Sequence, residues 1–107
     1  MKTEQISLFV RIRAKAGKRD ECEALLERLF EQSRLEPSFV TAAVHRDAME
    51  HDVLAIYETW NESRDSFLEH APQRAYFAKC QQNLEPLVER RDIWWLETPP
   101  RRSGERP

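Results

Sequence analysis

The sequence predicts a single α+β domain in which four strands and two helical regions follow one another in the order βαββαβ. Apolar residues alternate with a period of two in four segments and recur at helical spacing in two others. The chain has 107 residues, of which 40% are hydrophobic and 34% charged, a composition typical of one globular domain. The polar connection between the second and third strands is short, which favours an antiparallel hairpin.

The N-terminal part contains a strand and then a helix. Residues 6–13, "ISLFVRIR", place their even-numbered apolar side chains on one face of a strand. Gly17 then turns the chain. Over residues 18–34, apolar residues recur at i, i+3, i+4, i+7 and i+8, which predicts a helix. Pro37 disfavours helical geometry at the residue before it, so the helix is expected to end there.

A hairpin and a second helical region follow. Residues 39–46, "FVTAAVHR", and 53–60, "VLAIYETW", are rich in β-branched and aromatic residues and predict two strands. The second helical region begins near Asn61, with Asn61 or Ser63 as its N-cap. Pro72 is expected to break or kink this helix, because proline removes a backbone donor.

Residues 91–97, "RDIWWLE", predict the fourth strand, which follows the end of the helix marked by Pro86. The domain is expected to span residues 1–97. Residues 98–107 are rich in Pro and Arg and are expected to form a flexible tail. This order of elements is that of the ferredoxin-like fold, a four-stranded antiparallel sheet with two helices on one face.

Bulky apolar residues occupy both faces of the predicted strands, although two helices can cover only one face. Since a monomer rarely exposes a large apolar patch, we expect a homodimer that packs sheet face against sheet face. Bulky residues alternate along each of the last three strands and therefore lie on both faces. The first set is Val40, Val44, Leu54, Ile56, Trp94 and Leu96, and the residues that alternate with it are Phe39, Val53, Tyr57, Ile93 and Trp95.

Composition and charge exclude several classes of protein. The net charge is −2 with both signs interspersed, so no basic surface for nucleic acid is expected. No stretch approaches the roughly 20 apolar residues that span a bilayer, and the N-terminus does not resemble a signal peptide, so we expect no membrane association and a cytoplasmic location. Cys22 and Cys80 lie among apolar residues and have no neighbouring ligands for zinc. We expect them to be reduced packing residues.

The domain resembles a known family. The segments "ISLFVRIRAKAGKRDECEALLERLFEQSRLEPSFV", "HRD", "YETWNESRDSFLEH" and "AYFAKCQQNLEPL" are similar in order and spacing to the antibiotic biosynthesis monooxygenase (ABM) family over about residues 5–97. The resemblance implies a dimeric α/β-barrel built from two ferredoxin-like subunits. It also implies a cofactor-independent monooxygenase that oxidises a quinol or hydroxylated aromatic, polyketide-like substrate with O2 and uses neither metal nor flavin.

This chemistry requires an apolar cavity, a base of suitable pKa and donors that orient the substrate ring. His70 is the candidate base, because it lies at a helix end just before a proline break. Trp60 is a candidate cavity wall whose indole N–H points inward, and Tyr76 is a candidate hydroxyl donor. The candidate substrate-binding residues are Phe67, Phe77 and Arg11.

Other interpretations of these residues stay open. Arg11 either orients an anionic substrate or pairs with an acid across the sheet, such as Glu58, and pairing is the simpler reading. In a regular strand Tyr57 projects to the face opposite Trp60, which places it at the dimer interface. His45 serves as a base only if its face of the second strand lines the cavity.

Two further activities of the family fit the residues poorly. Haem-degrading relatives hold iron with a histidine ten positions beyond the place of His70, and this chain has Cys80 there. Their first-strand asparagine falls at Val10. The sugar-phosphate isomerase branch would need a cluster of phosphate-binding groups, which the sequence lacks. A second histidine often found where Gln73 or Arg74 stands is also missing, which leaves the alternative of a non-enzymatic ligand-binding or interaction domain.

Overall fold

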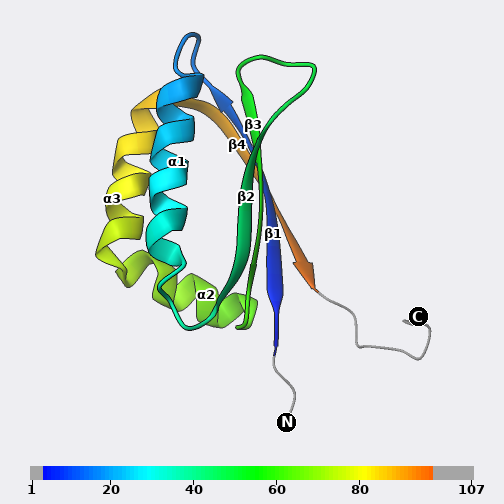
Figure 1. Cartoon of the computed structure of the whole chain (residues 1–107), viewed down its shortest axis with the longest axis vertical. Coiled ribbons are helices and arrows are strands. Elements are labelled where there is room, and N and C mark those ends of the chain that lie inside the picture. Colours follow the sequence, from blue (N-terminus) through cyan, green and yellow to red (C-terminus); the bar gives the residue numbers. More distant parts are fainter. Residues whose placement is uncertain (1–3, 98–107) are drawn as a thin grey trace, which may run out of the picture.

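The computed structural model of the chain describes residues 4–97, and the predicted tail at 98–107 lies outside this part. Four strands and three helices follow one another with two short 3₁₀ turns (Figure 1). Their bounds are β1 Ile6–Ala14, α1 Arg19–Ser33, β2 Phe39–Arg46, β3 Val53–Trp60, α2 Arg64–His70, η1 Ala71–Gln73, α3 Ala75–Leu84, η2 Glu85–Leu87 and β4 Val88–Glu97.

The strands form one antiparallel sheet in the order β2-β3-β1-β4. β1 lies inside the sheet, where Leu8 is opposite Glu58 of β3 and Trp95 of β4. The helices all lie on one side of the sheet and leave the other side free (Figure 1). The predicted ferredoxin-like α+β fold is therefore confirmed.

Several predicted element ends are confirmed. Ser63 is the N-cap of α2, with its side chain accepting a hydrogen bond from the backbone N–H of Ser66 at 3.1 Å. Pro72 breaks the second helical region into α2 and α3, separated by the turn η1. Gly17 has a φ of 79°, which favours glycine, in the turn closed by the hydrogen bond from Lys18 N to Lys15 O.

The prediction that the fourth strand starts at residue 91 was wrong, because β4 starts at Val88. Residues 88–90 pair with the end of β1 through an irregularity in register between Arg13 and Ala14. β4 is an edge strand, and edge strands tolerate charged side chains. Because residues 89–91 are polar, the hydrophobicity pattern did not indicate that residues 88–90 belong to the strand.

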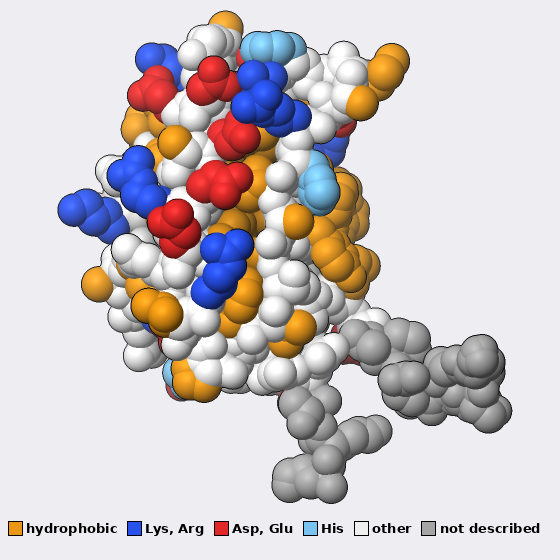
Figure 2. Space-filling view, in the orientation of Figure 1, with side chains coloured by type: hydrophobic (Ala, Val, Ile, Leu, Met, Phe, Trp, Pro, Cys, Tyr) orange, Lys and Arg blue, Asp and Glu red, His pale blue; other side chains and the backbone are white. Residues whose placement is uncertain are grey.

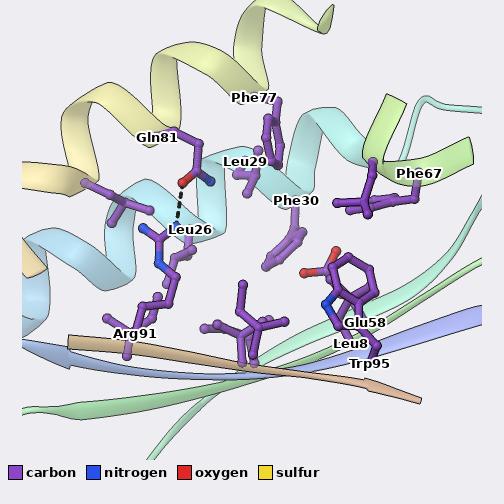
Figure 3. Close-up of a pocket in the computed structure, with 16 residues that line it drawn as sticks. Leu8, Leu26, Leu29, Phe30, Glu58, Phe67, Phe77, Gln81, Arg91 and Trp95 are labelled. Carbon is purple, nitrogen blue, oxygen red and sulfur yellow. Dashed lines mark hydrogen bonds between the residues drawn. The ribbon is translucent and has the colours of Figure 1, made fainter. Parts of the chain in front are cut away.

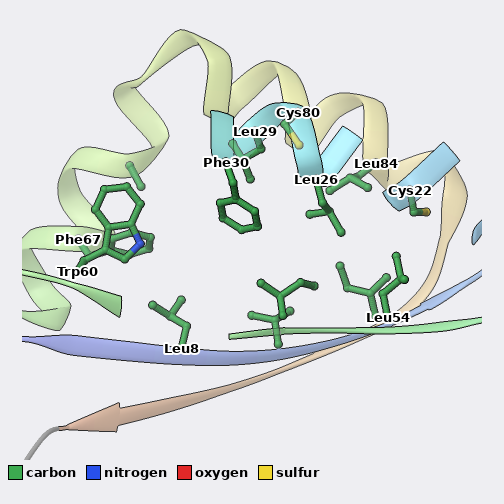
Figure 4. Close-up of a cluster of buried hydrophobic side chains, with 14 of the residues drawn as sticks. Leu8, Cys22, Leu26, Leu29, Phe30, Leu54, Trp60, Phe67, Cys80 and Leu84 are labelled. Carbon is green, nitrogen blue, oxygen red and sulfur yellow. The ribbon is translucent and has the colours of Figure 1, made fainter. Parts of the chain in front are cut away.

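The hydrophobic core lies between the helices and the inner face of the sheet (Figure 4). Alternate residues of β1, from Ile6 to Ala14, are all buried there. Cys22 and Cys80 are free thiols inside this core, and burial raises the pKa of both. Both cysteines therefore pack as predicted and are poor nucleophiles at neutral pH.

The outer face of the sheet carries exposed apolar side chains. Tyr57, Trp94 and Leu96 are 44%, 48% and 42% exposed, and the ring of Phe9 lies 5.5 Å from that of Trp94. Figure 2 shows hydrophobic side chains gathered on the side of the molecule away from the helices, whereas charges of both signs cover the helical side. No helix within residues 4–97 has the length and apolar character needed to span a bilayer.

Candidate functional site

A cavity of about 220 Å³ lies between the helices and the inner face of the sheet (Figure 3). Its walls are mainly apolar side chains from all three helices and from β1, β3 and β4. Leu68, Ile93 and Arg91 belong to this lining and are exposed, so the cavity opens to solvent along β4. The polar side chains that line it are Glu58, Gln81 and Arg91.

Glu58 places a carboxyl group inside this apolar cavity. Its position opposite Leu8 directs the side chain toward the helices, and only 9% of the residue is exposed. Burial raises the pKa of Glu58 to about 7, although a hydrogen bond from Trp60 acts in the opposite direction. The group therefore exchanges a proton near neutral pH, which suits a general acid or base.

Trp60 holds the Glu58 carboxyl group from two positions along β3. Its indole Nε1–H donates a hydrogen bond of 2.8 Å to Glu58 Oε1. The indole is itself fixed by Phe39 and Phe67, whose ring centroids lie 5.2 and 5.4 Å away, and by the guanidinium of Arg74, 5.1 Å from the ring centroid. Trp60 is only 2% exposed and is not among the residues that line the cavity, and its catalytic role stays a prediction.

His70 lies outside the lining of the cavity. Its side chain is 54% exposed at the end of α2. Its Nδ1 lies 2.9 Å from the carbonyl oxygen of Ser66, and since a carbonyl only accepts, the ring nitrogen is the donor in this contact. The structure thus places His70 against its own helix, and its catalytic role stays a prediction.

Tyr76 also lies outside this cavity. Its hydroxyl donates to Glu36 Oε2 at 2.9 Å, and the ring borders a smaller hollow between α1 and α3. Burial, followed by the contact with Glu36, raises the pKa of the phenol. Tyr76 joins α3 to the loop between α1 and β2, and a role as donor to a substrate stays a prediction.

Of the three predicted substrate-binding residues, Phe67 and Phe77 line the cavity and Arg11 does not. The pairing expected of Arg11 is present, but its predicted partner Glu58 was wrong. Arg11 Nη2 contacts Asp47 at 3.2 Å and Glu50 at 3.0 Å on the outer face of the sheet. Arg11 pairs with Ala55 in the sheet register, and alternation sends Arg11 and Glu58 to opposite faces.

The sequence interpretation missed Glu58 and Arg91 as cavity residues. The signal for Glu58 was present, because it alternates with the apolar residues Ile56 and Trp60 on one strand face. A carboxylate between two inward-facing apolar residues is expected to be buried. Arg91 carried no such signal, because the face of the sheet on which its side chain lies follows from the pairing of β4 with β1, which the polar start of β4 did not indicate.

Candidate metal ligands are scattered over the molecule. Within residues 4–97, no three His, Cys, Asp or Glu side chains gather closely enough to hold a metal ion.

His45 pairs with Ala55 on the outer face, away from the cavity.

Comparisons with known proteins give a family and a shared fold. No curated protein matches the chain. Among solved structures, PA3566 from Pseudomonas aeruginosa is 24% identical, with 94% of this chain and 98% of that chain covered and a TM-score of 0.80. A Bacteroides thetaiotaomicron protein described as of unknown function and a possible oxidoreductase is 22% identical, with 91% and 100% covered and a TM-score of 0.80.

A third structure, from Nitrosomonas europaea, carries a provisional name as an antibiotic biosynthesis monooxygenase. It is 16% identical, with 92% of this chain and 93% of that chain covered and a TM-score of 0.80. At these identities the structures show a shared fold alone. The family model described as antibiotic biosynthesis monooxygenase, however, matches residues 5–83, from β1 to the end of α3. The chain therefore belongs to the antibiotic biosynthesis monooxygenase family.

Proposed function

We propose that this protein is a cofactor-independent monooxygenase that oxidises a quinol or another hydroxylated aromatic with O2. The observation that carries the proposal is the Glu58 carboxyl group, buried in an otherwise largely apolar cavity. Family membership supports the class of reaction. The cavity of about 220 Å³ is below the common range of about 300–1,000 Å³ for ligand pockets, which favours a small substrate.

Glu58 is the proposed proton acceptor. With an anthrone-type substrate, the ring CH2 group loses a proton to the Glu58 carboxylate and leaves an anion delocalised onto the ring oxygen. This anion passes one electron to O2, and the substrate radical and superoxide combine into a peroxide at that carbon. When the O–O bond breaks, one oxygen stays as a carbonyl group. The other leaves as water with the second carbon-bound hydrogen and the proton returned by Glu58.

The surroundings of Glu58 fit this role. The pKa of about 7 keeps a large fraction of the carboxyl group ionised at neutral pH while making it a stronger base than an exposed glutamate. Trp60 fixes one carboxylate oxygen and leaves the other to receive the proton. Apolar walls reduce the water that would otherwise quench the anion.

The same cavity argues against a purely ligand-binding domain. A non-enzymatic member of the fold is expected to have a closed apolar cavity without an ionisable group. Here the cavity is open on one side and contains a buried carboxyl group. These two features favour catalysis over storage or simple binding.

The partners proposed are a small aromatic substrate, O2 and a second copy of the chain. The exposed apolar residues Phe9, Tyr57, Trp94 and Leu96 on the outer face of the sheet support a homodimer through sheet faces. No lining residue of the cavity belongs to that group, so each subunit holds its own cavity.

Oxygen consumption tests the proposed function. Purified protein is mixed with a panel of anthrones and naphthoquinols, and O2 uptake is followed with and without protein, together with the carbonyl product. We expect protein-dependent uptake that falls at least about 100-fold in Glu58→Gln, because that change removes the proton acceptor and keeps the shape. Uptake across the whole panel that is no faster with protein than without it would contradict the proposal.

A further inference from the structure

We propose that the cavity takes a hydroxylated aromatic ligand that carries a carboxylate at the end remote from its hydroxyl group. Arg91 holds the carboxylate at the mouth of the cavity, and Glu58 receives the hydroxyl group inside. This inference rests on the proposed function, because it sets the acidic hydroxyl group of the substrate against Glu58. In a quinol this hydroxyl group is itself the proton donor, and in the enol form of an anthrone its loss of a proton gives the same anion as loss of a proton from the CH2 group. The inference adds the class of substrate and the direction in which the substrate enters.

The cavity has two polar ends separated by apolar walls. Figure 3 shows Glu58 at one end and Arg91 at the other, with Phe30 between them. In the sheet register Glu58 is opposite Leu8, and Arg91 is opposite Ile12. Four residues along β1 correspond to about 14 Å. The proposal requires the long arginine and glutamate side chains to extend toward each other along the cavity, which brings their polar ends to the scale of a fused ring system.

Arg91 is a cation without a carboxylate partner in the part of the chain that is described. Its Nη1 donates to Gln81 Oε1 of α3 at 2.8 Å, and no ion pair of Arg91 occurs within residues 4–97. The neighbouring Arg90 differs, because its Nε lies 3.0 Å from Asp92 Oδ2. Since a guanidinium has five N–H donors in a planar fork, Arg91 retains donors for a bidentate carboxylate.

Glu58 is an acceptor that still lacks a donor on one oxygen. Its Oε1 receives the Trp60 indole N–H, and no residue among those described donates to its Oε2. With 9% of the residue exposed, this oxygen has little access to water. A buried acceptor gains from a hydroxyl donor, whereas an ionised Glu58 repels a second carboxylate at the same end. The hydroxyl group therefore enters first, and the carboxylate stays beside Arg91.

Anaerobic titration calorimetry tests this orientation with three probes. The probes are 2-naphthol, 6-hydroxy-2-naphthoic acid and 6-methoxy-2-naphthoic acid, bound to the native protein, Arg91→Gln and Arg90→Gln. Arg90→Gln is the matched control, because Arg90 is the adjacent arginine of β4, is opposite Arg13 and does not line the cavity. We expect the hydroxynaphthoate to bind at least about fivefold more tightly than naphthol or the methoxy acid.

In Arg91→Gln the preference for the carboxylate is expected to disappear, whereas Arg90→Gln keeps it. Equal affinities for naphthol and hydroxynaphthoate in the native protein would overturn the inference. So would a preference that survives Arg91→Gln or is lost equally in Arg90→Gln, and so would failure of all three probes to bind. Because these titrations exclude O2, they separate the two proposals. A preference for the carboxylate without any O2 uptake would contradict the proposed oxygenation and leave this inference standing. O2 uptake with uncharged quinols, without a preference for the carboxylate in the titrations, would contradict this inference and leave the proposed oxygenation standing.

Discussion

Glu58 is the residue on which most of the proposed chemistry depends. The burial of its carboxyl group also makes the free energy of unfolding depend on pH. A glutamate with a pKa raised to about 7 in the folded protein holds its proton more tightly than in the unfolded chain, where the pKa is about 4.5. The contribution of Glu58 to the free energy of unfolding is therefore most favourable below about pH 4.5. This contribution falls as the pH rises to about 7 and changes little above that.

Glu58→Gln should remove this pH dependence. The amide oxygen of glutamine can still accept the Trp60 N–H, and it carries no charge to bury. Relative to the native protein, we expect the variant to gain about 2–3 kcal/mol in free energy of unfolding between pH 5 and pH 8. Urea denaturation of both proteins at the two pH values measures this difference.

The difference between the two proteins isolates Glu58 from the other carboxylates. Asp47 and Glu50 have lowered pKa values, mainly through hydrogen bonds with the backbone and with Arg13 respectively, and they are present in both proteins. Parallel pH profiles for native protein and Glu58→Gln would mean that the carboxyl group is not buried as described.

At the scale of elements, α2 connects the end of β3 to the cavity. It has only seven residues, and its side chains Phe67 and Leu68 line the cavity. A short helix gains little from its own hydrogen bonds, so its N-cap and its packing hold it in place. Ser63 is that cap, and it keeps Phe67 against Trp60 and Trp95.

Ser63→Ala should lower the free energy of unfolding by about 1 kcal/mol, because it removes the acceptor for the Ser66 backbone N–H. Ser63→Asp is the control, since aspartate is also a favourable N-cap and should keep stability close to that of the native protein. Thermal denaturation of the three proteins gives the comparison. A loss in Ser63→Asp equal to that in Ser63→Ala would show that the cap is not what stabilises α2.

Most elements could be predicted from the sequence, because their hydrophobic patterns are local. β2 and β3 have the predicted bounds, and the break at Pro72 follows from proline geometry alone. The site was harder to predict, because a cavity is formed by residues from many elements. Phe67 and Phe77 belong to the predicted second helical region and were named as candidates, whereas Arg91 required the pairing of β4 with β1.

His70 and Tyr76 illustrate the same difference. Both were chosen for chemical type, and local contacts decided where they point. His70 turns back to the Ser66 carbonyl group, and Tyr76 donates a hydrogen bond to Glu36 in the loop after α1. The burial of Glu58, by contrast, could be predicted from strand alternation, but Glu58 was interpreted as an acid that pairs with Arg11 across the sheet.

At the scale of the whole molecule, the free face of the sheet is the feature that predicts assembly. Trp94 is 48% exposed and packs on Phe9 in this face. If two copies pair through it, Trp94→Lys should place a charge in the interface and halve the mass measured by light scattering at micromolar concentration.

Leu35→Lys is the matched control for this experiment. Leu35 is 84% exposed and lies in the loop between α1 and β2 rather than on a strand, so the same change there should leave the mass of the dimer unaltered. A native protein that is already monomeric at micromolar concentration would contradict the proposed homodimer.

The pH dependence of kcat/KM for O2 uptake tests the central claim that Glu58 accepts the substrate proton. In the native protein and in His70→Gln, we expect the rate to rise with a midpoint near pH 7, the pKa of Glu58 in its cavity. In Glu58→Gln the rate should be at least about 100-fold lower and lack that rise. Full activity in Glu58→Gln, or loss of activity and of the pH midpoint in His70→Gln alone, would contradict the assignment.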